Sequence, residues 1–208
     1  MKKLIKRSAL TALLTVLPLS SAFALSVASE EGNLTGNSQG LILYDFESGN
    51  PAGLTGDFTI FDTPSGTNLS APPLNSPDGN HYLSVPNPFG TGSATLDFGQ
   101  DMNYLGLYWG SIDTYNSIEF FLGGGSVGVL LGSALPPAEG GQTALNQNLY
   151  VNITGVVFDK VVFKSTNYAF EMDNIAANPV PEPATMLLFG TGLIGLAGIS
   201  ARRKKKQL

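Results

Sequence analysis

Two groups of oxygen-bearing side chains stand at opposite ends of the central part of this 208-residue chain. The segment YDFES contains Asp45 and Glu47, and the segment FEMDNIA contains Glu171, Asp173 and Asn174. Calcium takes about six to eight oxygens from carboxylates, amides and carbonyls, so these are side chains of the type that a calcium site uses. The first and last strands of a β-sandwich often lie side by side, which would bring these oxygens together. We expect Asp45 and Asp173 as first ligands, with Glu47 and Asn174 next. The alternative is that they face solvent on edge strands, where charge discourages aggregation.

A second candidate site is made of aromatic rings in the segment YLGLYWGSIDTY. Flat rings with polar tips suit the apolar faces of sugars, so a glycan-stacking platform would use four residues: Tyr104, Tyr108, Trp109 and Tyr115. Alternation with period two puts residues 105, 107 and 109 on one face of a strand and residues 104, 106 and 108 on the other. Packing in the core is therefore the competing interpretation of Trp109.

Catalytic chemistry has little support in the sequence. The chain has one histidine, His81, which sits in the turn-like segment DGNHYLSV, and it has no cysteine. We interpret His81 as a turn or strand-edge residue, and we expect no enzyme activity. A glycosidase built on two carboxylates is kept as a distant alternative, because fifteen acidic residues between Leu25 and Pro179 supply many candidate pairs.

The charge of the chain is distributed unevenly. The formal net charge is −5, but between Leu25 and Pro179 fifteen Asp and Glu face only Lys160 and Lys164, which gives this part −13. Such a domain repels nucleic acid and anionic surfaces, and it favours cations or neutral polar ligands. Nucleic-acid binding is therefore excluded from the expected functions.

These candidate residues must be positioned by strands, because the middle of the chain shows short alternating apolar runs and no sustained helical period. Turn-forming sequences such as SPDGNH and LGGGS separate most of the runs, and FLGGGSVGV joins two strands, which predicts a hairpin. The expected strands are 40–47, 57–63, 80–86, 94–99, 104–111, 117–123, 126–132, 149–155, 159–165 and 170–176. This pattern predicts an all-β domain over 39–177, an antiparallel β-sandwich of jelly-roll type with a single core. Residues 25–38 are expected to form a disordered leader.

The amino-terminal segment 1–24 predicts a secretory signal peptide. A basic stretch precedes an apolar run, and Ala22 and Ala24 form the small-x-small pattern that signal peptidase cuts, here after Ala24. The apolar run is too short to span a bilayer of about 30 Å. We therefore expect the rest of the chain to be exported.

The carboxyl-terminal segment predicts a membrane anchor. Residues 184–201 carry no charge and are followed by a basic tail, 202–208, whose five cations are Arg202, Arg203, Lys204, Lys205 and Lys206. Basic residues beside an apolar helix stay in the cytoplasm, so the acidic domain is expected on the outer side of the inner membrane. Pro181 and Pro183 bracket Glu182 and stiffen the chain just before the apolar segment.

Together, VPEPATMLLFGTGLIGLAGISARRKKKQL resembles the PEP-CTERM protein-sorting signal, which spans 178–208 here. The resemblance implies that exosortase, a membrane transpeptidase of Gram-negative bacteria that make exopolysaccharide, recognises the motif 181–183. Val180, Pro181, Glu182 and Pro183 would then be substrate residues, and the implied partners are signal peptidase, exosortase and, transiently, the inner membrane. The mature protein would reach the cell surface or extracellular matrix.

The first and last strands, with DFE and Asp-Asn-Ile, are also similar to jelly-roll carbohydrate-binding modules, many of which hold a structural calcium. Two functions stay open for the domain. The first is a structural or adhesive surface protein linked to exopolysaccharide, and the second is a calcium-assisted carbohydrate-binding module.

Overall fold

The computed structural model describes residues 25–31, 42–62, 70–75, 81–86, 90–135, 137–141, 143–181 and 191. The described part is all-β and antiparallel, as the sequence predicts, and its strands join into one hydrogen-bonded sheet of eleven strands. The strands are β1 (Ser26–Glu31), β2 (Ile42–Tyr44), β3 (Leu54–Gly56), β4 (Thr59–Asp62), β5 (His81–Val85), β6 (Gly92–Gly110), β7 (Asn116–Leu122), β8 (Gly125–Leu131), β9 (Leu149–Thr154), β10 (Phe158–Ser165) and β11 (Phe170–Pro179). Two short 3₁₀ turns, Gly132–Ala134 and Leu145–Gln147, follow β8 and precede β9.

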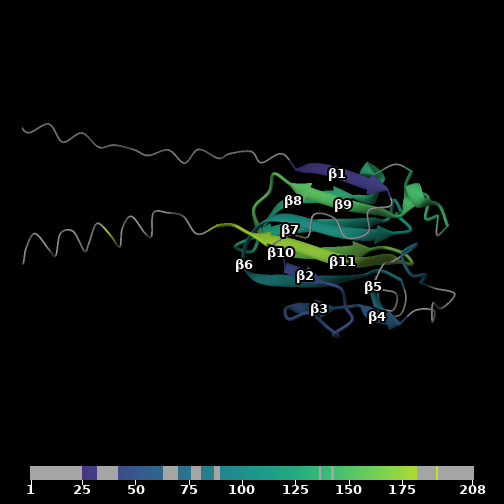
Figure 1. The fold of residues 1–208 in the computed structure, drawn as a ribbon, viewed down its shortest axis with the longest axis horizontal. Helices are drawn as coiled ribbons and strands as arrows, with labels where there is room; N and C mark the ends of the chain where they lie inside the picture. The colour runs from purple at the N-terminus through teal and green to yellow at the C-terminus, as the bar shows by residue number, and fades with distance from the viewer. Residues whose placement is uncertain are drawn as a thin grey trace, which may run out of the picture.

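The sheet folds into two layers because the long strand β6 takes part in both (Figure 1). Its first half pairs with β10 and β3, and its second half pairs with β11 and β9. We call the strands β8, β7, β10, β3 and the first half of β6 the β7 layer. The β11 layer contains β4, β5, β2, β11, β9, β1 and the second half of β6.

One core fills the space between the layers. The alternation in β6 is confirmed, because Leu105, Leu107 and Trp109 all belong to the buried apolar cluster. Trp109 stacks on Phe170 of β11 at 4.3 Å between ring centroids. Phe170 in turn meets the edge of Phe163 from β10 at 5.8 Å, although β10 and β11 do not pair as strands. The aromatic chain therefore links one layer to the other.

The segment FLGGGSVGV forms a hairpin, as the sequence predicts. Leu122 of β7 pairs with Gly125 of β8, and the two residues between them, Gly123 and Gly124, have φ angles of 57° and 86°. Two successive positive φ angles are the requirement of the tight hairpin turn that matches strand twist, and glycine meets it at least cost.

Two expectations are corrected by the strands. The expected strands 94–99 and 104–111 are parts of the single strand β6, because the backbone of the intervening residues stays extended. The expected disordered leader 25–38 is wrong over Ser26–Glu31, which pairs along its whole length with β9. Backbone hydrogen bonds from β9 order this segment, and Val27 packs against the core.

Candidate functional site

The first and last expected strands do lie side by side. Tyr44 of β2 pairs with Ile175 of β11, so Asp45 follows at the level of Asn174. On the same edge of β11, Met172 pairs with Leu83 of β5. The end of β2 and the start of β5 therefore meet beside residues 173 and 174, and we call this place the β2–β5 junction.

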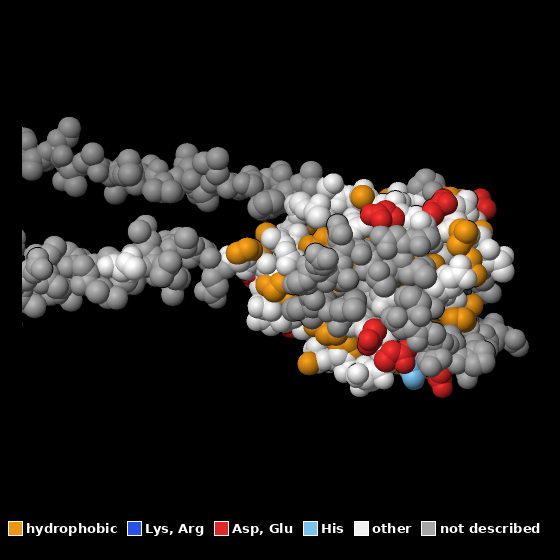
Figure 2. All heavy atoms as spheres, viewed as in Figure 1, with side chains coloured by type: hydrophobic (Ala, Val, Ile, Leu, Met, Phe, Trp, Pro, Cys, Tyr) orange, Lys and Arg blue, Asp and Glu red, His pale blue; other side chains and the backbone are white. Residues whose placement is uncertain are grey.

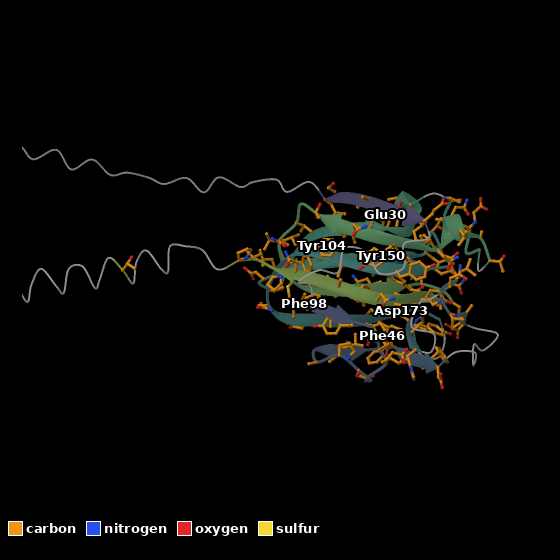
Figure 3. The ribbon with its side chains drawn as sticks, in the orientation of Figure 1. Glu30, Phe46, Phe98, Tyr104, Tyr150 and Asp173 are labelled. Carbon is orange, nitrogen blue, oxygen red and sulfur yellow. The ribbon has the colours of Figure 1, made fainter. Side chains whose placement is uncertain are left out.

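A bulge in β11 shapes the junction. The register between β11 and β6 shifts between Asp173 and Ala176, and Asn174 within the shift has a φ of 49°. Asp173 and Asn174 are both fully buried, and the Asn174 amide donates to Asp173 Oδ1 at 2.7 Å. Phe46, with a φ of 62° and its ring in the core, turns the chain beside them (Figure 3).

His81 occupies the outer side of the junction. As the first residue of β5, it is the strand-edge residue that the sequence predicts. Glu47 accepts hydrogen bonds from the His81 amide and from Nδ1, each at 2.9 Å. The hydrogen bond to Glu47 raises the pKa of His81, with smaller contributions from the charges of Asp62 and Asp173. In Figure 2 the pale-blue histidine lies beside acidic side chains at the lower rim.

The four expected calcium ligands thus come from adjacent segments but have different surroundings. Asp45 Oδ1 accepts from the Glu47 amide at 3.2 Å, and both Glu47 oxygens are engaged by His81. Among the residues that the structure describes, no group of three His, Cys, Asp or Glu side chains is placed to hold a metal ion. Asp45, Asp173 and Asn174 carry hard oxygen donors, which are the type of ligand that suits calcium.

The expected glycan-stacking residues do not form a platform. Trp109 lies in the core and Tyr108 is also fully buried, so neither ring has a face open to a sugar. The Tyr108 hydroxyl donates to the Leu74 carbonyl, and burial raises its pKa to about 12. Tyr115 is half-buried and donates to the Tyr168 carbonyl. Packing in the core, the competing interpretation of Trp109, is the correct one.

Tyr104 belongs instead to a polar network on the outer face of the β11 layer (Figure 3). Its hydroxyl donates to Asn152 Oδ1 at 2.6 Å, and the Asn152 amide donates to Glu30 at 3.4 Å. Tyr150 donates to the Asn174 carbonyl at 3.3 Å. Burial raises the pKa of Tyr104 and of Tyr150, so both stay neutral.

A short segment, residues 70–75, packs on the same face, and we call it the strap. The side chains of three buried residues hold it by hydrogen bonds. The Ala71 amide donates to Glu171 Oε1 at 3.2 Å, the Leu74 amide donates to Asn148 Oδ1 at 3.1 Å, and Tyr108 donates to the Leu74 carbonyl. Glu171 is only 2% exposed, and burial raises its pKa to about 7 against the lowering effect of the Ala71 amide.

Sequence reasoning placed Glu171 in the acidic group of FEMDNIA without choosing it as a ligand, and it did not single out the strap. The alternation of Phe170 and Met172 with Glu171 and Asp173 was a usable signal that these acids share the outer face. No local pattern indicated that the strap covers Glu171, because the two are a hundred residues apart.

The folded domain continues directly into the predicted sorting motif. Pro179, the last residue of β11, pairs with Met102, and the Val180 amide donates to the Asp101 carbonyl at 2.9 Å. Pro181 is exposed. Glu182, Pro183, the basic tail and the expected signal-peptidase residues Ala22 and Ala24 lie outside the described residues. None of the described helical residues forms a helix long and apolar enough to cross a membrane, and the expected span 184–201 is described only at residue 191.

Residues 179–204 match the model of the PEP-CTERM protein-sorting motif. The chain carries a PEP-CTERM sorting signal. It is therefore an exported protein, made as a membrane-anchored precursor and processed by exosortase. The matched segment begins at Pro179, where β11 ends, so the signal starts inside the last strand of the domain.

Other comparisons add little to this result. A search of curated proteins finds no match. Among solved structures, the chain is similar to "CpGH89CBM32-6 produced by Clostridium perfringens", with 14% identity, a TM-score of 0.33, and coverage of 62% of this chain and 96% of the other. A similarity of this size supports no inference about function.

Proposed function

We propose that the β-domain of this PEP-CTERM protein is a structural or adhesive surface protein without catalytic activity, retained at the cell surface or in the extracellular matrix through exopolysaccharide. The observation that carries the proposal is the continuity of β11 with the sorting signal, which makes the whole domain the cargo of that signal. The net charge of −13 between Leu25 and Pro179 supports neutral polar partners over anionic ones.

The proposed route fixes the orientation of the precursor. Signal peptidase removes residues 1–24, the apolar segment stops transfer, and the five cations of the tail remain in the cytoplasm. The hydrogen bond from Val180 to Asp101 holds the motif close to the domain. Exosortase then binds the motif at the outer surface of the inner membrane, where it meets Val180, Pro181, Glu182 and Pro183.

Mass spectrometry of the mature carboxyl terminus in the native host tests the route. A terminus near Pro183 is expected for the wild type, and an intact RRKKKQL tail is expected for Glu182→Ala and for a strain without exosortase. Glu139→Ala, an exposed acid far from the motif in sequence, is the matched control and should be processed normally. An intact tail on the wild type would contradict the proposal.

Cell fractionation tests the adhesive role. The mature protein should sediment with cells or matrix in a strain that makes exopolysaccharide, and it should appear free in the medium of a strain that does not. Equal distribution in the two strains would remove exopolysaccharide as the retaining partner and would leave the sorting route untouched.

The second candidate function is a calcium-assisted carbohydrate-binding module, and the specific observation that favours it is the β2–β5 junction. Asp45 directly follows β2, which pairs with β11 next to Asp173 and Asn174, and these three side chains carry hard oxygen donors. Calcium bound only to the folded state must raise the melting temperature. A higher melting temperature in calcium than in chelator is expected for the wild type but not for Asp45→Asn.

Asp62→Asn, which removes an exposed acid from the neighbouring strand β4, is the control and should keep the calcium response. A glycan array with and without EDTA then decides between the two functions. Absence of any glycan signal under both conditions would eliminate the binding module.

A further inference from the structure

The strand β8 is a sheet edge without charge or proline, and its one interruption is a bulge at Val127 in the register with β7. Among the described residues it pairs only with β7, and its sequence GSVGVLL contains no charge and no proline. Val127, Val129 and Leu131 are 39%, 50% and 50% exposed. Natural proteins usually guard such edges with charges, because an exposed apolar edge can pair with another chain.

Two other edge strands of the described sheet are guarded in that way, whereas the three-residue strands β2 and β3 carry no charge. The strand β1 ends in Glu30 and Glu31, and β4 ends in Asp62. These carboxylates repel a second copy of the same acidic domain. The contrast identifies β8 as the edge at which two copies can approach.

The charge of the neighbouring strands supports a second copy as the occupant. The strands β7, β8 and β10 contain two acids, Glu119 and Asp159, and both lysines of the domain, Lys160 and Lys164, so their formal charge is zero. The remaining thirteen acids between Leu25 and Pro179 lie outside these strands, in parts of the domain that contain no Lys or Arg. Two copies therefore meet at β8 without the repulsion that the rest of their surfaces would impose.

We propose that β8 pairs antiparallel with β8 of a second copy of this chain, about a two-fold axis at Gly128. On the free edge of β8, residue i of one copy then lies opposite residue 256 minus i of the other, and the bulge at Val127 is repeated on both sides of the axis. Val127 faces Val129 of the second copy, and the two β7 layers join into one continuous sheet. Apolar β-branched pairs of this kind stabilise a ladder.

This pairing adds a second copy of the chain as a partner to the structural role proposed above. Its use in the matrix rests on that proposed role, whereas the pairing itself rests on β8. The mature protein would be a symmetric dimer with its two sorting-signal ends on separate β11 strands. Such a dimer would present two copies of the domain to exopolysaccharide and so strengthen weak binding.

The absence of cysteine from the chain allows a direct test. In the full chain expressed in its host, the double variant V127C/V129C places the two thiols opposite each other across the proposed axis. We expect a disulfide-linked dimer on non-reducing gels. The matched control S26C/A28C puts two exposed cysteines on the guarded edge β1 and should give at least about tenfold less dimer, because like charges oppose its approach.

A second, cysteine-free pair of variants separates pairing from folding. Val129→Glu should shift the purified mature protein to monomer in sedimentation velocity, whereas Val129→Thr, which keeps the β-branched shape, should remain largely dimeric. Unchanged far-UV circular dichroism in both would show that the fold is intact.

Three results would overturn the proposal: equal cross-linking of V127C/V129C and S26C/A28C, a V127C/V129C adduct with a different protein, or a monomeric wild type at all concentrations. Retention by exopolysaccharide is measured in the same cultures. Cross-linking without retention would leave the pairing and remove the matrix role, and retention without cross-linking would remove the pairing alone.

Discussion

The outer faces of the two layers of this sandwich differ in how their polar groups and apolar side chains are used. On the β11 layer, the strap and the tyrosines cover the sheet, and buried Glu171 and Tyr108 hold the strap by hydrogen bonds. On the β7 layer, Val129 and Leu131 are half exposed, and the main polar contact is the ion pair of Lys164 with Glu119. In the described part of the chain, one face, the closed face, is thus covered by the strap, and the other, the open face, is the more exposed.

The largest expected effect concerns Glu171 on the closed face. Its pKa of about 7 in the folded state lies above its ordinary value of 4.5, so the folded state binds the proton more tightly. The stability linked to Glu171 is therefore complete below pH 4.5 and is lost as the pH rises through 7. Glu171→Gln should raise the free energy of unfolding at pH 8 by up to about 3 kcal/mol, measured by urea denaturation.

Glu119 on the open face is the matched control, with the opposite sign. The hydrogen bond from Lys164 lowers the pKa of Glu119, so its contribution is present at neutral pH and is lost only as the pH falls below its ordinary value of 4.5. Glu119→Gln should therefore leave the slope of stability between pH 5 and 8 unchanged. A similar change of slope in both variants would contradict the assigned burial of Glu171.

The next effect compares two glycines in strands. A Cβ atom at Gly106 would lie 2.3 Å from the Tyr104 hydroxyl and 2.6 Å from that of Tyr150, whereas one at Gly128 would first meet Leu25 at 3.5 Å. Gly106→Ala should destabilise the fold by about 1–3 kcal/mol, because it displaces rigid rings from a hydrogen-bonded network.

Gly128→Ala should cost less than about 1 kcal/mol, since alanine also loses less conformational entropy than glycine on folding. Thermal melts of the two variants measure the difference. An equal loss of stability in both would show that the closed face is packed no more tightly than the edge of the open face.

The smallest effect compares one polar contact from each face. Tyr108→Phe removes the only hydroxyl bound to the Leu74 carbonyl in the described part of the chain, and it should cost about 1–2 kcal/mol. Lys164→Ala removes an ion pair in which the lysine side chain is 45% exposed, and it should cost less than about 1 kcal/mol. Urea denaturation in low and high salt measures the free energy of unfolding of each variant. Added salt should reduce the difference from wild type for the lysine variant but not for the tyrosine variant.

The sequence predicted the parts whose signals are local. Alternation in 104–109 identified the buried face of β6, the glycine pair at 123–124 predicted a hairpin, and the order of prolines, apolar run and basic tail indicated the sorting signal. Each signal lies within a few tens of residues, where period, turn chemistry or charge determines the outcome. The expected neighbours β2 and β11 also followed from the topology of a sandwich.

The sequence could not predict features that depend on partners distant along the chain. The segment Ser26–Glu31 has no strand-like alternation and becomes β1 only because β9 offers an unpaired backbone edge. The sequence left open whether Trp109 is exposed or buried. In the structure, Phe170 packs on its ring and the side chain is buried. The binding of Glu47 to His81 was missed because β2 and β5 meet only through their common neighbour β11.

The sequence alone thus determined an exported all-β chain with an acidic domain and a sorting signal, because composition, period and local order are properties of short segments. Tertiary structure decided which face is closed, which edge is open and which acid is buried. Those outcomes depend on hydrogen bonds and packing between residues up to a hundred positions apart, and no local pattern specifies such contacts.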